Sequence, residues 1–243
     1  MSRIAYVNGA YVPHGQAVVH VEDRGFQFAD GVYEVWSVFD GRLADFDGHM
    51  TRLVRSLTEL RIDVPMTRDA LTRVLKETVR RNRVRNGIVY LQVTRGTARR
   101  DHPFPPQGTP PSVIVTARSI SAVKAEAQAD RGVAVITQPD IRWGRCDIKT
   151  VGLRTRDTQA NILRGITRAA VLDLVAGEKI ELDERPFSVD EAKRAREAFF
   201  TAAGAFVMPA ISIDGTTIGD GTPGPVTRKL RTLYLEQARR EAI

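Results

Sequence analysis

The sequence predicts an α+β fold in two domains, over residues 1–117 and 132–243, joined by a linker over 118–131. Two observations predict the fold class. Apolar, strand-like stretches are separated by turn dipeptides, and amphipathic helices lie between them. A third observation predicts the boundary, because the stretch 118–131 consists mainly of small and polar residues.

The first domain is predicted to contain two hairpins. Asn8-Gly9 separates two alternating apolar stretches, and Asp40-Gly41 divides a second pair of strands over 31–46. Both dipeptides are frequent in two-residue turns because Asn, Asp and Gly accept positive φ angles. We therefore expect antiparallel strands on both sides of each dipeptide.

Two amphipathic helices and two strands complete the first domain. Over 48–62 the apolar residues recur at spacings of three and four, which places them on one face of a helix. A second helix is predicted over 67–84, with Thr67 as its cap. Apolar, β-branched runs predict the strands over 87–96 and 111–118.

The second domain is predicted to mix strands with helices and to end in a hairpin and a helix. The stretch between Leu153 and Gly165 is the exception, since it is polar and has no clear period. The predicted elements are strands over 133–138, 147–153 and 180–187, helices over 165–177 and 189–200, a hairpin over 208–219 and a closing helix from about Pro225.

Composition excludes several classes of protein. Hydrophobic residues make up 42% of the 243 residues and charged residues 27%, which is typical of a globular chain. No apolar run approaches the length of a transmembrane helix, and the first residues lack the apolar core of a signal peptide. We therefore expect a cytoplasmic protein without a membrane partner. The single cysteine and the scattered histidines indicate no metal site.

The basic charge is spread along the chain. Lys and Arg number 36 against 29 acidic residues, and the net charge of +7 would by itself suit a nucleic-acid partner. The arginines are mixed with acidic residues over most of the chain, so we expect no nucleic acid and keep a basic binder as the last alternative. Only six of the 36 are lysines, so few residues can supply amine chemistry.

Lys149 is the candidate nucleophile. A lysine that forms a Schiff base must be partly neutral, which requires burial or a cationic neighbour. Among the six lysines, Lys149 alone has apolar, strand-like residues on both sides. The alternative, a lysine at a strand end whose amine reaches solvent, stays open on these grounds.

Two further patterns could bind anions. Ile166 and Thr167 open a predicted helix, where free backbone N–H groups and a hydroxyl suit an anion; an ordinary helix start is the alternative. Arg100 and His102 are two residues apart, so on an extended segment both point the same way and could hold a carboxylate. The alternative for this pair is a solvated basic loop.

Arg52 and Tyr33 are ambiguous from the residues alone. Arg52 lies among apolar residues of a predicted helix and is either an inward phosphate ligand or a surface arginine. Tyr33 lies in a predicted strand and would by default be part of the core.

These segments together resemble the fold-type IV pyridoxal-phosphate aminotransferases, and among them most closely the D-amino-acid aminotransferases. The resemblance covers almost the whole chain in the expected order. It implies a small N-terminal α/β sandwich domain and a larger C-terminal pseudo-barrel domain. The segments that carry it are 28–35, 49–53, 90–96, 98–105, 141–153, 162–168, 198–209 and 218–227.

The resemblance implies pyridoxal 5'-phosphate as the cofactor. Lys149 would form the Schiff base with it and shuttle the Cα proton. Arg52 would bind the phosphate together with Ile166 and Thr167. Ala203 stands where the family usually has a threonine-rich phosphate contact, so it could contribute only its backbone.

The resemblance also implies a reaction, which is amino transfer between D-amino acids such as D-alanine and 2-oxo acids such as 2-oxoglutarate. Arg100 and His102 match the Arg-x-His pair that holds the substrate carboxylate, and Tyr33 would line the substrate pocket. A homodimer is implied as well. The alternatives are an (R)-selective amine transaminase on the same scaffold and a catalytically impaired deletion form.

The sequence departs from the family after Leu153. About forty residues that the family carries before the helix at Gly165 are absent, and with them the glutamate that supports the pyridine nitrogen. No glutamate stands between Lys149 and Glu178. We therefore expect weak cofactor binding and slow turnover from this chain.

Overall fold

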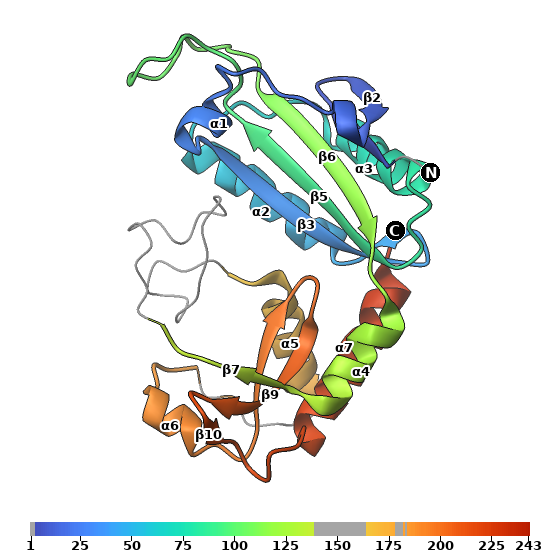
Figure 1. Cartoon of the computed structure of the whole chain (residues 1–243), viewed down its shortest axis with the longest axis vertical. Coiled ribbons are helices and arrows are strands. Elements are labelled where there is room, and N and C mark those ends of the chain that lie inside the picture. Colours follow the sequence, from blue (N-terminus) through green and yellow to red (C-terminus); the bar gives the residue numbers. More distant parts are fainter. Residues whose placement is uncertain (1–2, 139–163, 178–181, 183) are drawn as a thin grey trace. The chain divides into compact units, whose positions relative to one another are not determined.

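The chain divides into two compact units in the computed structural model (Figure 1). Unit 1 comprises the residues up to Ile120 together with Ile243, and unit 2 comprises the described residues from Ser121 to Ala242. The residues that the structure describes are 3–138, 164–177, 182 and 184–243.

Unit 1 is built on a six-stranded antiparallel sheet with the strand order β2-β1-β6-β5-β3-β4. Asn8, Gly9, Asp40 and Gly41 all have positive φ angles, which confirms both predicted hairpin turns. The strands are β1 (Ile4–Val7), β2 (Ala10–Pro13), β3 (Gly31–Phe39), β4 (Arg42–Leu43), β5 (Gly87–Thr94) and β6 (Ser112–Ser119).

Two helices, α2 (Phe46–Glu59) and α3 (Arg68–Arg81), cover one face of this sheet (Figure 1). Both were predicted, and Thr67 caps α3 as expected, because its hydroxyl accepts from the N–H of Ala70 at 3.3 Å. Short turns at His14–Gln16 (a 3₁₀ helix) and Arg24–Phe28 (α1) connect β2 to β3.

Alternation along β3 and β5 separates the two faces of the sheet. Side chains such as Trp36, Leu53 and Leu91 are fully buried between the sheet and the helices and form one continuous core. Tyr33 and Tyr90 point to the other face and are only half-buried. That second face, which the unit's own helices do not cover, is therefore where an aromatic pocket can form.

The edge of this sheet includes residue 243. The N–H of Leu43 donates to the carbonyl of Ile243 at 2.9 Å, and the N–H of Ile243 donates back to Leu43 at 3.0 Å. The reciprocal pair ties residue 243 to β4, within unit 1.

Unit 2 contains a smaller sheet around β9. This strand pairs in parallel with β7 and antiparallel with β8 and β10, while α7 packs on β9 and α5 packs on α7 and β8. The elements are α4 (Ala122–Arg131), β7 (Val133–Val135), α5 (Ile166–Gly177), α6 (Val189–Lys193), β8 (Ala198–Ala202), β9 (Phe206–Ile213), β10 (Thr216–Thr217) and α7 (Pro225–Glu241).

The stretch 118–131, expected as a linker, is mostly the helix α4. Ser121 caps it by accepting from the N–H of Lys124 at 3.3 Å. Several of its small residues are alanines, which favour helices more than any other residue. The two compact units nevertheless meet in the sequence next to this cap, at Ile120 and Ser121.

Two predictions of secondary structure in unit 2 are wrong. None of the described residues within 180–187 forms a strand, and Pro186 there lacks the N–H that a sheet needs. The helix expected over 189–200 ends at Lys193, and β8 begins at Ala198. Tertiary pairing with β9 decides this segment, whose two consecutive phenylalanines also favour a strand. The strand expected over 147–153 lies outside the described residues.

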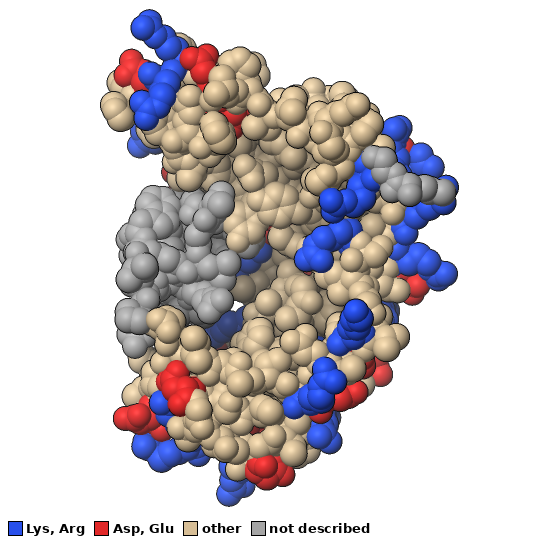
Figure 2. All heavy atoms as spheres, in the orientation of Figure 1, with Lys and Arg blue, Asp and Glu red and all other residues tan. Residues whose placement is uncertain are grey.

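The surface charge agrees with the mixed pattern of the sequence. Figure 2 shows Lys and Arg side chains in separate groups over the visible face, with Asp and Glu among them. Within the described part of the chain, no helix combines the length and the apolar character needed to cross a membrane.

Candidate active site

Two tyrosines stack on the face of the unit 1 sheet that lies opposite α2 and α3. The ring centroids of Tyr33 and Tyr90 lie 5.5 Å apart at an interplanar angle of 25°, and the hydroxyl of Tyr90 donates to Gln92 at 2.8 Å. Burial, with a smaller effect from Tyr33, raises the pKa of Tyr90 to about 12. Burial and the nearby Glu34 carboxylate also raise the pKa of Tyr33, against the opposing charge of Arg52. Both tyrosines are therefore neutral phenols at neutral pH.

A buried ionic cluster lies on the opposite side of β3, beneath α2. Glu34 accepts from Nε and Nη2 of Arg52, both at 2.7 Å, and its Oε2 lies 2.7 Å from Nδ1 of His49. Arg52 is 9% exposed and Glu34 is fully buried. His49 and Arg52 are three residues apart, so α2 presents both to the same strand position.

The charge state of this cluster follows from its contacts. Burial alone would raise the pKa of Glu34, but the hydrogen bonds from Arg52 and His49 outweigh it and hold that pKa below its ordinary value. The carboxylate therefore stays ionised and fixes the plane of the Arg52 guanidinium by a two-point contact.

Arg100 and His102 lie on the exposed loop that follows β5, and this loop bends instead of continuing as an extended strand. Both side chains nevertheless reach one ring. The guanidinium carbon of Arg100 lies 5.2 Å from the centroid of Phe28, and the ring of His102 lies 6.1 Å from it. Arg24 lies over the same ring at 4.7 Å. Phe28 thus gathers the two predicted carboxylate ligands.

Unit 2 contains a helix start and a tight turn. Helix α5 begins at Ile166, the N–H of Ala169 donates to the carbonyl of Gly165 at 2.9 Å, and Thr167 is buried. N–H groups in the first turn of a helix have no acceptor within the helix, which suits an anion. Ala203 lies in the turn between β8 and β9, and α5 packs on β8.

Arg231 of α7 forms hydrogen bonds to the backbone at the turn that contains Ala203. Nη1 of Arg231 donates to the carbonyls of Ala205 at 3.2 Å and of Val207 at 2.9 Å, and its Nη2 pairs with Glu126 at 3.0 Å. Arg231 is 6% exposed, so this contact is made inside the unit.

The structure places the predicted site residues in separate groups. Arg52 is hydrogen-bonded in the buried ionic cluster, and Tyr33 stacks on Tyr90. Arg100 and His102 both lie near the ring of Phe28. Lys149 lies outside the described residues, so its expected role stays a prediction.

Sequence reasoning missed Glu34, His49 and Phe28. Glu34 could have been found, because an acidic residue occupies an inward position of an otherwise apolar strand. His49 carries a weaker signal, its spacing of three from Arg52. Phe28 has none, since its role depends on where the distant loop folds.

The donor chemistry fits the phosphate of pyridoxal 5'-phosphate. Phosphate is bound in proteins by arginines whose guanidinium is oriented by a carboxylate, and by first-turn N–H groups, which have no acceptor within their own helix. Ala203 offers only its backbone.

Comparison with known proteins points to one family. The model of the family described as amino-transferase class IV matches residues 31–161 and 152–213. D-alanine aminotransferase of Bacillus licheniformis is 37% identical over 267 aligned residues, covering 93% of this chain and 93% of that protein. D-alanine aminotransferase of Staphylococcus haemolyticus is 32% identical, covering 93% of this chain and 94% of that protein.

Solved structures share the fold. The branched-chain amino acid aminotransferase of Escherichia coli has a TM-score of 0.84 and 21% identity, covering 100% of this chain and 97% of that chain. The branched-chain aminotransferase of Thermoproteus uzoniensis with norvaline has a TM-score of 0.80 and 22% identity, covering 99% of this chain and 97% of that chain. At these identities the likeness establishes the fold alone, and it confirms the predicted fold class.

The alignment also exposes a gap. It spans 267 positions with the Bacillus licheniformis protein, whereas 93% of the 243 residues is only about 226. About 41 aligned positions therefore have no residue in this chain. The two family matches meet at 152–161, where the sequence predicted the missing segment.

Proposed function

Because the chain belongs to the class IV aminotransferase family, we propose that it transfers amino groups between D-amino acids such as D-alanine and 2-oxo acids such as 2-oxoglutarate. The observation that carries this proposal is the convergence of Arg100 and His102 on the ring of Phe28. A guanidinium and an imidazole at one place suit a substrate carboxylate, which a simple amine lacks. The activity for which the two relatives are named supports the same substrate class.

Tyr33 is proposed to line the substrate pocket close to the cofactor. Its raised pKa keeps the phenol protonated at neutral pH, so it can donate a hydrogen bond. Its stacking on Tyr90 restricts the ring to one orientation.

Pyridoxal 5'-phosphate, when bound, supplies the electron-accepting ring that this chemistry needs. We assign phosphate binding to Arg52, to the backbone N–H groups of Ile166 and Thr167, and to the backbone of Ala203. The support is the oriented guanidinium in unit 1 and the helix start in unit 2. Glu34 and His49 are proposed to keep Arg52 in place.

Lys149 is proposed as the residue that holds the cofactor and moves the Cα proton. The support comes from the sequence, where apolar residues flank this lysine on both sides. A working homodimer and a cytoplasmic location are expectations of the same kind, and light scattering of the purified protein would test the first.

Substrate preference tests the proposed function. Turnover of the purified protein with pyridoxal 5'-phosphate is measured with D-alanine, L-alanine and (R)-1-phenylethylamine, each with a 2-oxo acid acceptor. We expect D-alanine to be preferred over both, even if all rates are low, and Lys149→Ala to abolish turnover. Turnover of the amine without turnover of D-alanine would replace the proposal by the amine-transaminase alternative.

A further inference from the structure

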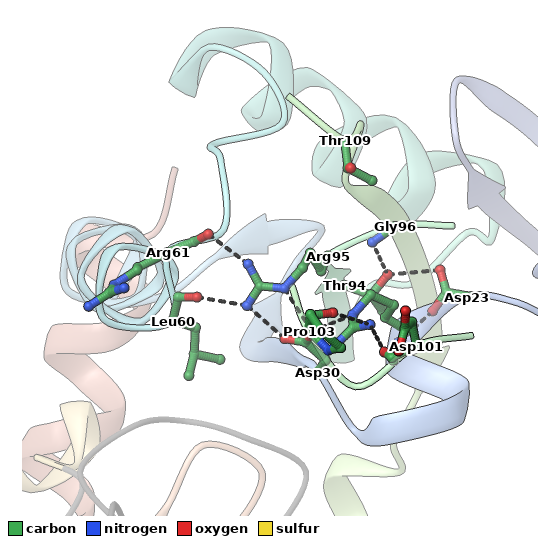
Figure 3. A network of polar contacts seen from close by, with 12 residues as sticks. Asp23, Asp30, Leu60, Arg61, Thr94, Arg95, Gly96, Asp101, Pro103 and Thr109 are labelled. Atoms are coloured by element: carbon green, nitrogen blue, oxygen red, sulfur yellow. Dashed lines mark hydrogen bonds and ion pairs between the residues drawn. The ribbon is translucent and has the colours of Figure 1, made fainter. Parts of the chain in front are cut away.

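Figure 3 shows an ionic cluster around Asp30 and Arg95, close to Asp101. Asp101 belongs to the loop that also carries Arg100 and His102. Asp30 accepts from Nε of Arg24 at 2.9 Å, and from Nε and Nη2 of Arg95 at 2.7 and 2.9 Å. Arg24 is 4% exposed and Arg95 is 7% exposed. One carboxylate thus orients two buried guanidinium groups.

Arg24 reaches from this cluster into the loop. Its Nη1 donates to the carbonyl of Asp101 at 3.0 Å and approaches the carbonyl of Pro103 at 3.5 Å. Asp101 stands between Arg100 and His102, so the contact fixes the backbone from which both side chains project. The contact is to the main chain and is independent of the side chain at position 101.

Arg95 ties the same cluster to the end of α2. Its Nη1 and Nη2 donate to the carbonyls of Arg61 at 2.7 Å and Leu60 at 2.8 Å, as Figure 3 shows. The ring of Phe104 lies over its guanidinium at 4.3 Å. The loop is therefore anchored to unit 1 by Arg24 at Asp101 and by Arg95 at Phe104.

Packing alone leaves this loop room to move. A cavity of about 540 Å³, lined among others by Arg95, Phe104 and Pro105, borders it. Arg100 and His102 are themselves exposed. A loop beside open space needs a directional contact to hold one conformation.

We propose that Arg24 is a positioning residue for substrate carboxylate binding, acting through the Asp101 carbonyl and supported by Asp30 and Arg95. The inference rests on the proposed function, since it assumes that Arg100 and His102 bind the substrate. Arg24 does not touch the substrate. Only a planar guanidinium can bond the Asp30 carboxylate and the loop carbonyl together and also lie over the ring of Phe28.

Arg24→Lys tests the proposal, because it keeps the charge and removes the fork. Arg73→Lys, the same change on an exposed helix face of unit 1, is the control. The Michaelis constant for D-alanine should rise about tenfold or more in Arg24→Lys, as expected for a displaced binding group. That for (R)-1-phenylethylamine should change less than twofold, and Arg73→Lys should leave both unchanged.

A second readout needs neither cofactor nor substrate. Native trypsin digestion, followed by mass spectrometry of the fragments that end at Arg99 and Arg100, reports how often the loop opens. Cleavage should be several-fold faster in Arg24→Lys than in the wild type or in Arg73→Lys. If Arg24→Lys fails to give a cooperative melt, Asp30→Asn replaces it in both measurements.

The two readouts separate the two proposals. Unchanged cleavage, or an equal loss with D-alanine and the amine, would overturn the positioning role of Arg24. If the wild type turns over the amine but not D-alanine, the proposed function falls and the positioning of substrate falls with it. In that case faster cleavage would show only that Arg24 holds the loop.

Discussion

The sheets of unit 1 and unit 2 differ in how their strands pair and in how well their apolar side chains are buried. In unit 1, neighbouring strands pair antiparallel throughout, and two helices bury one continuous core against them. In unit 2, β9 carries every described pairing, and Phe199 and Phe200 on β8 remain 39% and 41% exposed. The two family matches overlap at 152–161, which in the sequence lies between β7 and α5. Unit 1 therefore has its own antiparallel sheet with a continuous buried core. The second family match begins only at residue 152, and we infer that the positions missing relative to the relatives belong to unit 2.

Restoring the missing positions should produce the largest effect. A version with a family-like insert of about 41 residues after Leu153 should bind the cofactor more tightly and turn over D-alanine at least about a hundredfold faster. The insert would supply an acid for the ring nitrogen and cover apolar surface of unit 2. Cofactor should raise the melting temperature of the longer form only. Full activity of the printed chain would contradict this prediction.

Glu34→Ala should break the framework of unit 1. It leaves the Arg52 guanidinium buried without its carboxylate, which typically costs about 3 to 5 kcal/mol of unfolding free energy. Denaturant unfolding measures the change. Glu77→Ala, which removes the acid from two surface ion pairs, with Arg80 and Arg81, is the control and should change little. Equal losses of unfolding free energy in Glu34→Ala and Glu77→Ala would show that burial of the Glu34–Arg52 pair does not contribute to stability.

Arg231→Gln should weaken the corresponding contact in unit 2. The arginine holds two carbonyls beside the turn of Ala203, and hydrogen bonds from a charged group contribute about 1.5 to 3 kcal/mol. Thermal or denaturant unfolding measures the loss, with exposed Arg228→Gln on the same helix as the control. If Arg231→Gln lost as much unfolding free energy as Glu34→Ala, the buried contacts of unit 2 would be as important for stability as those of unit 1.

Acidification should weaken unit 1 through two paired carboxylates, the buried Glu34 and the partly buried Asp30. Burial alone would raise the pKa of Glu34 and of Asp30, but their ion pairs outweigh it and lower both. The unfolded chain then binds more protons than the native chain once the pH falls into the ordinary carboxyl range, so stability decreases with falling pH. The advantage of wild type over Glu34→Ala should be complete above about pH 5 and shrink toward about pH 3. Urea unfolding at several pH values measures it, and a constant advantage would contradict the assignment.

Thr67→Ala should have the smallest effect. It removes one capping hydrogen bond at the start of α3, which costs about 1 kcal/mol. Because the site is exposed and uncharged, the loss should not depend on pH. A pH-dependent loss would show that the acid response of unit 1 is not confined to its ion pairs.

The sequence predicted best where a local signal and the tertiary structure agree. Asn8-Gly9 specifies a turn by its own φ angles, and the helix that Thr67 begins is periodic throughout. The prediction of a helix at 198–200 was wrong, because pairing with β9 overrides the helical pattern of the residues before it. The strand expected at 180–187 failed for a local reason, since Pro186 cannot donate to a neighbouring strand.

The candidate site was predictable only in part. Arg100 and His102 carry a recognisable spacing, and Arg52 stands out as a charge on an apolar helix face. The partners that orient them come from distant positions, as when Arg24 bonds the carbonyl of Asp101. Such contacts have no local pattern, because they arise only when two segments fold together.

The pairing of Leu43 with Ile243 bears on the order in which the molecule is made. A ribosome that adds about 5 to 20 residues per second needs about 10 to 40 seconds to travel from one to the other. The last strand of the unit 1 sheet ends at Ser119, so for most of that interval the rest of the sheet has been synthesised while the backbone at Leu43 still lacks its partner at residue 243. A nascent chain at this stage presents an open strand edge, which closes only after residue 243 has emerged.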